Sequence, residues 1–401
     1  MSGSRIVRRA HVESEDADAS GLIRRDSRSQ GNSSLTTPTR APGEADVLHR
    51  LTLLNRFLPL WILAAMALGL LLGRTIPALN GWLDAVKIGS VSLPIAIGLL
   101  LMMYPVLAKV KYTKVGSVTR DRRTIGISLL LNWVIGPALM FTLAWLMLPD
   151  LPAYRTGLII VGLARCIAMV LVWNDLACGD RELAVVLVAV NSVFQIIAYA
   201  LLGWFYLRLL PGWLGLDTAT LHVTIWEIAR IVLVFLGIPL AAGFLTRTIG
   251  ERTKGTEWYE ERFLPRISPV SLYGLLFTIV VLFALQGHKI TSDPWDVARI
   301  ALPLLAYFAV MWFGAFALGL RMHFPYERNT AVAFTAAGNN FELGIAVAIG
   351  VFGVTSGEAL AGVVGPLIEV PVLVSLVYVA LWARHRFYPA VTNSEPSKDG
   401  V

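Results

Sequence analysis

From Phe57 onward the chain carries ten apolar stretches, each about long enough to cross a lipid bilayer as a helix. A backbone in lipid must satisfy its own hydrogen bonds, and apolar runs of about 20 residues do so as helices rather than as the short alternating strands of a barrel. The sequence therefore predicts an all-α integral membrane protein. The ten stretches are 57–73, 90–109, 124–148, 155–174, 182–209, 224–246, 267–286, 298–320, 329–352 and 359–382.

The composition excludes a water-soluble globular domain. Of 401 residues, 56% are hydrophobic and 15% are charged, and the mean hydropathy is +0.66. The net charge of +7 could suggest a nucleic-acid partner, but the basic residues lie in short loops where membrane topology explains them, so none is expected. The two cysteines, Cys166 and Cys178, are too far apart on one helix to pair and have no zinc motif. We therefore expect two reduced thiols and no cofactor.

The chain divides into two tails and one transporter domain. Residues 1–50 are polar and charged without apolar periodicity, which predicts a disordered cytoplasmic tail. The transporter domain is expected over 51–388, with a first repeat at about 55–210 and a second at about 220–384, and residues 389–401 form a cytoplasmic C-terminal tail.

Basic residues gather after the second and sixth stretches, which lie on one side of the membrane if the N-terminus is cytoplasmic. The loop after the first stretch holds only Arg74 and Lys87, so the positive-inside rule predicts a multi-pass plasma (inner) membrane protein with both termini in the cytoplasm. Because five stretches follow five, the second half enters the bilayer inverted, as an inverted-topology repeat requires. The clustered residues are Lys109, Lys111, Lys114, Arg120, Arg122 and Arg123 after the second stretch, and Arg247, Arg252, Lys254, Arg262 and Arg266 after the sixth.

The fourth and ninth stretches are interrupted by polar residues at matching places in the two halves. Glu182 and Glu358 follow them at an offset of 176, and adding 176 to Cys166 gives Glu342. Matched interruptions of this kind point to the mid-membrane binding site of a secondary transporter. We expect two discontinuous helices, the fourth and the ninth, that cross near the middle of the membrane.

Three side chains in or near these stretches could handle a substrate or a proton. Cys166 is a soft ligand that can hold a soft electrophile reversibly, although a lone cysteine in a helix is more often a packing residue. Glu342 is costly in a bilayer unless protonated or paired, so it could carry a proton, or form a structural ion pair with Arg165. Glu369, between Pro366 and Pro371, is a second candidate for proton or ligand handling.

Other polar residues could line a pathway. Asn339 and Asn340 supply amides and follow a glycine, as a helix interruption would need. Asn191 and Gln195, one turn apart, either hydrogen-bond between helices or line the pathway. Trp173 fits an interfacial anchor better than a substrate contact, and it is retained among the residues that could line the pathway. For Arg165 we favour pairing with a carboxylate over reaching toward the membrane surface.

With these residues in place, the sequence resembles the arsenite efflux permeases of the arsenical-resistance family, in the superfamily that also holds bile-acid and riboflavin transporters. The resemblance covers about residues 50–388, through the motifs Gly-Leu-Ala-Arg-Cys-Ile-Ala-Met-Val-Leu-Val-Trp and Ala-Ala-Gly-Asn-Asn-Phe-Glu-Leu. It implies a ten-helix carrier, and not an enzyme, that extrudes arsenite, with antimonite as a further substrate, in exchange for protons. It places the family's essential thiol at Cys166 and its essential carboxylate at Glu342. Arg165, Asn340 and Glu369 match further functional positions.

Two other functions remain open on the sequence alone. A sodium-coupled organic-anion carrier of the same fold could use the oxygens of Asn339, Asn340, Glu342 and Gln195, although the thiol argues against it. The other alternative is a membrane enzyme or receptor that contains the helical bundle. The sequence has no nucleophile–base pair, zinc motif or soluble catalytic domain that would support it. The sequence leaves the oligomeric state and the range of metalloids open.

Overall fold

The computed structural model describes residues 57–76, 87–88, 91–110, 122–216, 223–292 and 294–388. The chain divides into residues 1–42, which lie outside that part, and residues 43–401, which hold every element described below. Both predicted tails, 1–50 and 389–401, and Lys111, Lys114 and Arg120 of the first basic loop lie outside the described residues.

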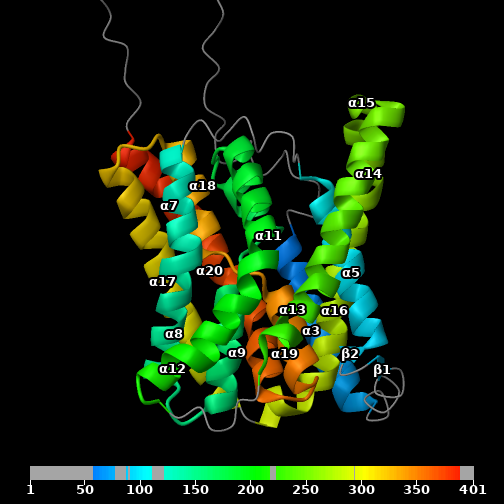
Figure 1. The fold of residues 1–401 in the computed structure, drawn as a ribbon, viewed down its shortest axis with the longest axis vertical. Helices are drawn as coiled ribbons and strands as arrows, with labels where there is room; N and C mark the ends of the chain where they lie inside the picture. Colours follow the sequence, from blue (N-terminus) through cyan, green and yellow to red (C-terminus); the bar gives the residue numbers. More distant parts are fainter. Residues whose placement is uncertain are drawn as a thin grey trace, which may run out of the picture. The chain divides into compact units, whose positions relative to one another are not determined.

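Helices make up nearly all of the described chain (Figure 1). The first two are α3 (Leu58–Thr75) and α5 (Leu93–Ala108), and two-residue strands β1 (Lys87–Ile88) and β2 (Val91–Ser92) pair antiparallel directly before α5. Two long helices, α17 (Pro294–Arg321) and α20 (Gly357–Phe387), run without interruption through internal prolines. Each of the ten apolar stretches coincides with helical segments.

In the described part of the chain, four helices contain a single wider turn with π-helical hydrogen bonding. They are α7 (Arg122–Leu130), η2 (Leu131–Ile135) and α8 (Gly136–Met147); α11 (Arg181–Trp204), η3 (Phe205–Leu209) and α12 (Leu210–Trp213); α13 (Ile225–Val232), η4 (Leu233–Gly237) and α14 (Ile238–Lys254); and α15 (Thr256–Trp258), η5 (Tyr259–Phe263) and α16 (Leu264–Ser292).

Each of these wide turns ends two residues before a proline, at Pro137, Pro211, Pro239 or Pro265. A proline has no N–H to give to the carbonyl four residues back, and its ring crowds that carbonyl. Widening the preceding turn separates the two groups while the helix continues. The prolines therefore distort these helices locally without ending them.

Two helices are broken in the middle by extended backbone. The first break separates α9 (Pro152–Leu163) from α10 (Met169–Leu176), and the second separates α18 (Tyr326–Ala337) from α19 (Phe341–Phe352). The residues that end α9 and α18, Ala164 and Gly338, both take extended conformations, with ψ of 122° and 139°. The predicted discontinuities of the fourth and ninth stretches are therefore present.

The basic segment after the sixth stretch is helical, which corrects its prediction as a loop. Helix α14 continues to Lys254, the chain reverses at Gly255, and the next helix starts at Thr256. Gly255 has φ of 88°, a left-handed conformation that favours glycine. Hydropathy marks only the apolar part of a helix, whereas the polar residues that follow, rich in Glu, Arg and Lys, keep a high helix propensity.

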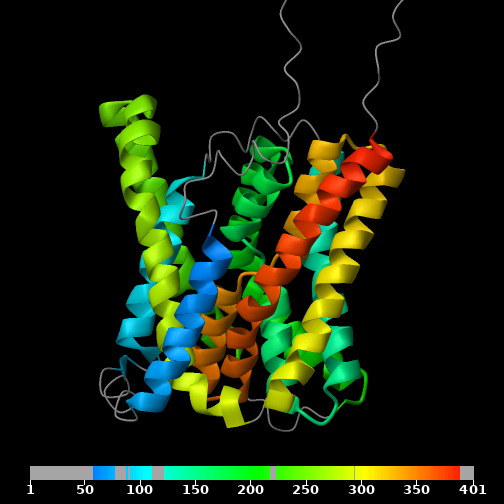
Figure 2. The ribbon, with the colours of Figure 1, turned by 180° about the vertical axis from the view of Figure 1, so that it is seen from behind.

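The helices pack in two groups. In the first, here called the panel, α16 lies against α3 and α5, and α14 lies against α5. In the second, the core bundle, α17 packs on α18 and α20, while α9 packs on α8, α19 and α20. Figures 1 and 2 show the panel beside the core bundle, with α14 and α15 extending past the neighbouring helix ends.

Among the residues that the structure describes, six helices are long and apolar enough to cross a membrane: Arg122–Met147, Arg181–Trp213, Ile225–Lys254, Thr256–Gly287, Pro294–Arg321 and Gly357–Phe387. Many large apolar side chains on their outer faces are exposed, including Leu146 at 72% and Ile197 at 66%. Exposed Trp213, Trp226 and Trp295 sit at helix ends, where tryptophan favours the membrane interface. This surface is suited to lipid rather than water, and the protein is a helical integral membrane protein.

Candidate functional site

The two helix breaks cross and hydrogen-bond to each other through their backbones. The N–H of Cys166 donates to the carbonyl of Gly338 at 3.3 Å, and the N–H of Asn340 donates to the carbonyl of Ala164 at 3.0 Å. Arg165 and Asn339 face each other between them as an antiparallel bridge. The interruptions, more than 170 residues apart in the sequence, therefore form one structure, here called the crossing.

The pairing at the crossing corrects the register taken from the sequence. At the crossing, residues 164, 165 and 166 correspond to residues 338, 339 and 340, an offset of 174. With this offset, the two hydrogen bonds between the breaks are equivalent: residue 166 donates to residue 338, and residue 340 donates to residue 164. The offset of 176 holds for the helices that follow, because α11 starts at 181 and α20 at 357. The two halves differ in length between break and next helix, so the counterpart of Cys166 is Asn340 rather than Glu342.

Cys166 and Asn340 also cap the half-helices that follow them. The Sγ of Cys166 accepts the N–H of Val170 at 3.3 Å, and the Oδ1 of Asn340 accepts the N–H of Leu343 at 3.0 Å. Both side chains are buried, at 4% and 1% exposure. The sulfur therefore lies inside the protein at the N-terminal end of α10, where it accepts one of the N–H groups that the first helical turn leaves unpaired.

Arg165 is fully buried without a carboxylate partner among the described residues. Its guanidinium donates to the Tyr307 hydroxyl at 2.8 Å and to the carbonyl of Gly162, and its Nε has no partner. The expected ion pair with a glutamate is therefore replaced by hydrogen bonds to neutral acceptors. An arginine that keeps its charge at a buried site supplies a fixed positive field at the crossing.

Tyr307 is a site residue that the sequence analysis missed. It lies on α17, is fully buried, and its hydroxyl accepts from Arg165 and approaches Asn339 Oδ1 at 3.4 Å. One hydroxyl therefore connects both breaks. A tyrosine in an apolar stretch gives no local signal of this role, because the contact depends on how α17 packs.

The two membrane carboxylates lie near the thiol. Glu342 is in the first turn of α19 and is partly exposed, whereas Phe341 and Leu343 beside it are buried. Glu369, on α20, is 5% exposed, has the backbone N–H of Asn339 within reach of its carboxyl group, and leaves Oε1 without a partner. Both carboxylates are close enough to Cys166 for their charges to act on its sulfur.

The amides of α11 face the same region. Gln195 accepts the backbone N–H of Arg165, and Asn191 accepts the indole N–H of Trp133 at 3.0 Å. Both form contacts between helices, the first of the two alternatives for this pair, and both leave their amide nitrogens unpartnered. Trp173 is only 1% exposed, so its interpretation as an interfacial anchor is wrong.

A cavity of about 490 Å³ lies between the panel and helices α10 and α11, which pack on α18 of the core bundle and form the core wall. The ends of α5 and α16 form one wall, which carries Lys109 and Glu260, and α10 and α11 form the other, which carries Arg181 and Glu182. The cavity reaches Val188, one helical turn from Asn191. The cavity therefore lies at the same end of α11 as Arg181 and extends along this helix as far as Val188.

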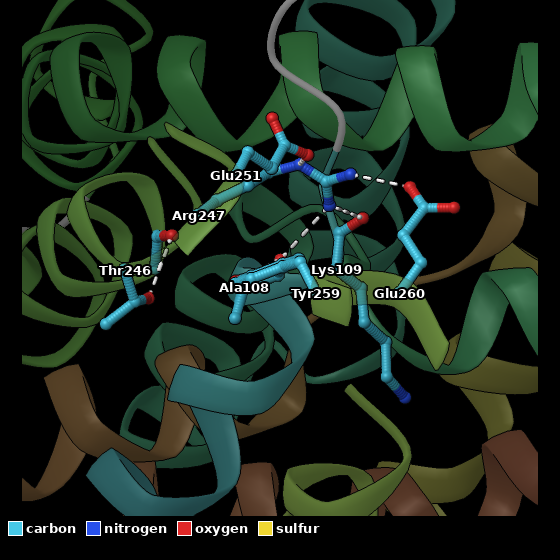
Figure 3. A network of polar contacts seen from close by, with 8 residues as sticks. Ala108, Lys109, Thr246, Arg247, Glu251, Tyr259 and Glu260 are labelled. Carbon is cyan, nitrogen blue, oxygen red and sulfur yellow. Dashed lines mark hydrogen bonds and ion pairs between the residues drawn. The ribbon is translucent and has the colours of Figure 1, made fainter. Parts of the chain in front are cut away.

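The panel wall is braced by one buried arginine (Figure 3). Arg247 pairs with Glu251 at 2.9 Å and Glu260 at 2.8 Å, and donates to the carbonyl of Lys109 at 3.2 Å. The hydroxyl of Tyr259 donates to the Ala108 carbonyl at 3.1 Å. The end of α5 and the hairpin of α14 and α15 are thereby held together.

In the part of the chain that the structure describes, no three His, Cys, Asp or Glu side chains are grouped as a metal site. The crossing offers instead one thiol, two carboxyl groups, one arginine and several amides. This combination suits a soft, uncharged and strongly hydrogen-bonding solute better than a hard cation, which needs a cage of oxygens.

Comparisons with known proteins agree with this chemistry. Residues 96–293 match the model of the sodium bile acid symporter family. The chain is 59% identical over 340 residues to the arsenical-resistance protein Acr3 of Corynebacterium glutamicum, covering 85% of this chain and 92% of that protein. It is 37% identical to the uncharacterized transporter slr0944 of Synechocystis, over 82% and 88% of the two chains. It is 32% identical to Acr3 of Alkaliphilus metalliredigens, over 86% and 98%.

Proposed function

The chain belongs to the Acr3-type arsenite efflux permeases of the bile acid and arsenite transporter superfamily, and on that basis we propose that it extrudes arsenite from the cytoplasm in exchange for protons. The observation that carries the proposal is the position of Cys166, buried at the crossing of two broken helices and beside two carboxyl groups. Antimonite, the heavier trivalent metalloid with the same affinity for sulfur, is proposed as a second substrate.

We propose that the protein crosses the plasma membrane ten times as two inverted five-helix repeats, with both termini in the cytoplasm. The local twofold relation of the crossing supports the repeat. The orientation rests on basic residues, because the helix ends on the cavity side carry most of them. These are Lys109, Arg122, Arg123, Arg181, Arg247, Arg252, Lys254, Arg262, Arg321, Arg328, Arg384 and Arg386.

In the proposed cycle, arsenite enters the cavity as the neutral trihydroxide and reaches Cys166. The thiol condenses with one As–OH group: an S–As bond forms, an As–O bond breaks, and the thiol proton leaves with the hydroxyl as water. No electrons are transferred, and hydrolysis reverses the step. Because a single sulfur holds the arsenic, the cargo can be released, which a cage of three thiolates would prevent.

The proton is assigned to Glu342 and Glu369. Glu342 is partly exposed between the buried residues Phe341 and Leu343, and Glu369 contacts the crossing itself. Two carboxyl groups this close disfavour being charged together, so the loss of a proton from one affects the other. Cargo and proton thereby share one small region, as exchange requires.

The sodium-coupled alternative is less consistent with the crossing. The amide oxygens of Asn339, Asn340 and Gln195, which would coordinate Na⁺, each already accept a hydrogen bond. A carrier of that kind would require sodium and would ignore arsenite.

Arsenite accumulation in everted membrane vesicles tests the proposal. With an imposed pH gradient, the natural protein should accumulate arsenite and Cys166→Ala should not, whereas Cys178→Ala serves as the matched thiol control and should retain transport. Glu342→Gln should lose its response to the gradient. Normal arsenite accumulation by Cys166→Ala would refute the role of the thiol, and a fully gradient-driven Glu342→Gln would refute the role of the carboxylate.

A further inference from the structure

Four buried amide side chains at or near the crossing share one arrangement: each oxygen has a partner and each nitrogen has none. Their exposed fractions lie between 0% and 2%. The oxygens accept from the Trp133 indole for Asn191, from the Arg165 backbone for Gln195, from the Tyr307 hydroxyl for Asn339 and from the Leu343 backbone for Asn340.

The partners determine which end of each amide is free. Indole and backbone N–H groups can only donate, so they must face the oxygen of Asn191, Gln195 and Asn340. The Tyr307 hydroxyl accepts from Arg165, which also can only donate, and it donates its own hydrogen to Asn339 Oδ1. The orientation of all four amides follows from their neighbours, and the free end is the NH₂ group in every case.

The crossing therefore has an excess of hydrogen-bond donors. Four NH₂ groups and the Nε of Arg165 are unpartnered, whereas Oε1 of Glu369 is the one unpartnered buried carboxylate oxygen in the described part of the chain. Buried donors without acceptors are costly, and native proteins seldom leave several together. A bound ligand that presents several oxygen atoms would satisfy them.

We propose that this donor cradle, defined as the side-chain amides of Asn191, Gln195, Asn339 and Asn340, makes the protein select trivalent metalloids that keep their oxygen atoms over methylated ones. The inference rests on the proposed function, since Cys166 supplies the bond to arsenic. Once sulfur replaces one hydroxyl of arsenite, two oxygens remain to accept from the amides. In methylarsenite one of these positions is a methyl group, which accepts nothing and leaves buried donors unpaired.

The test compares initial uptake of arsenite and methylarsenite in everted vesicles, using the full chain. Gln195→Glu keeps an oxygen for the Arg165 N–H but removes the NH₂ group, and Gln195→Met removes both. Asn174→Asp alters a fully buried amide on α10 outside the cradle and is the matched control. The ratio of the two rates cancels differences in the amount of folded protein.

The natural protein should prefer arsenite, and each Gln195 variant should lower the arsenite-to-methylarsenite ratio by about three- to tenfold, the effect of one hydrogen bond. Asn174→Asp should leave the ratio unchanged. If a variant transports too slowly, the same ratio is measured as protection of Cys166 from maleimide in a Cys178→Ser background, where Cys166 is the sole thiol.

An unchanged ratio in both Gln195 variants would overturn the donor cradle, as would equal handling of the two substrates by the natural protein. These results differ from a failure of the proposed function, in which Cys166→Ala would transport arsenite normally. Loss of transport in Cys166→Ala with an unchanged ratio in the Gln195 variants would remove only the cradle.

Discussion

Tyr307→Phe removes one hydroxyl and tests whether that group holds the crossing together. The hydroxyl accepts from the buried guanidinium of Arg165 at 2.8 Å and lies 3.4 Å from Asn339 Oδ1. Phenylalanine keeps the ring, so the substitution changes hydrogen bonding rather than packing. A hydrogen bond to a charged group contributes about 1.5–3 kcal/mol, and the long bond to Asn339 adds roughly 0.5 kcal/mol. We expect the free energy of unfolding to fall by about 2–3.5 kcal/mol.

Tyr326→Phe is the matched control. The Tyr326 hydroxyl is also buried and donates to the Ala177 carbonyl at 2.7 Å, a neutral bond worth about 1 kcal/mol. Both variants are compared by the melting temperature of the purified protein in detergent and by initial arsenite uptake at equal protein amounts. Tyr307→Phe should melt lower than Tyr326→Phe and should lose most of its uptake, because Arg165 and Asn339 are no longer positioned. If the two variants match in both measurements, the hydroxyl does not organise the crossing.

Two further substitutions test the crossing and the cavity wall. Gly338→Ala places a new Cβ 2.9 Å from the Cβ of Cys166, at a backbone conformation that alanine can adopt, so arsenite uptake should fall. Gly314→Ala, whose new Cβ has no atom within 4 Å, is the control and should keep normal uptake. Equal uptake by the two variants would contradict the close approach of the two breaks. Arg247→Met removes the ion pairs to Glu251 and Glu260 and should lower the free energy of unfolding by about 2 kcal/mol in a denaturation measurement, whereas Arg252→Met, at an exposed position, should not. Similar losses in both variants would show that Arg247 does not brace this wall.

The positions of the helices could be predicted from the sequence because hydropathy over about 20 residues measures transfer from water to lipid directly. The matched interruptions of the fourth and ninth stretches could also be predicted, because polar and ionisable residues are costly in lipid and occur there mainly at functional sites. The wide turns could have been predicted as well: each precedes a proline within an apolar stretch, and a helix that must continue through a proline has few other ways to do so.

The partners of the site residues could not be predicted. We expected a carboxylate partner for Arg165 because an unpaired charge is costly in lipid. Its guanidinium instead donates hydrogen bonds to the Tyr307 hydroxyl on α17 and to the carbonyl of Gly162 in α9. The register of 176 was correct for the starts of α11 and α20 but shifted by two residues at the crossing. Such details depend on which helix surfaces meet, and the sequence of one helix carries no record of its neighbour.

The cavity and its walls indicate which movement the proposed cycle requires. On the panel side, Arg247 connects α14 to Glu260 and to the carbonyl of Lys109. On the other side, the N–H of Asp180 donates to the carbonyl of Glu327 at 2.8 Å and connects the start of α11 to α18. Each of these two contacts stays within its own wall, whereas α11 also packs on α13, the helix that continues into α14 of the panel. Lys109, at the end of α5, and Arg181, at the start of α11, lie near enough for their like charges to interact, and Arg181 also pairs with Asp175 of α10 at 3.5 Å. In the proposed cycle, a change in the width of the cavity moves α10 and α11 relative to the panel, and Cys166, which precedes α10, moves with them.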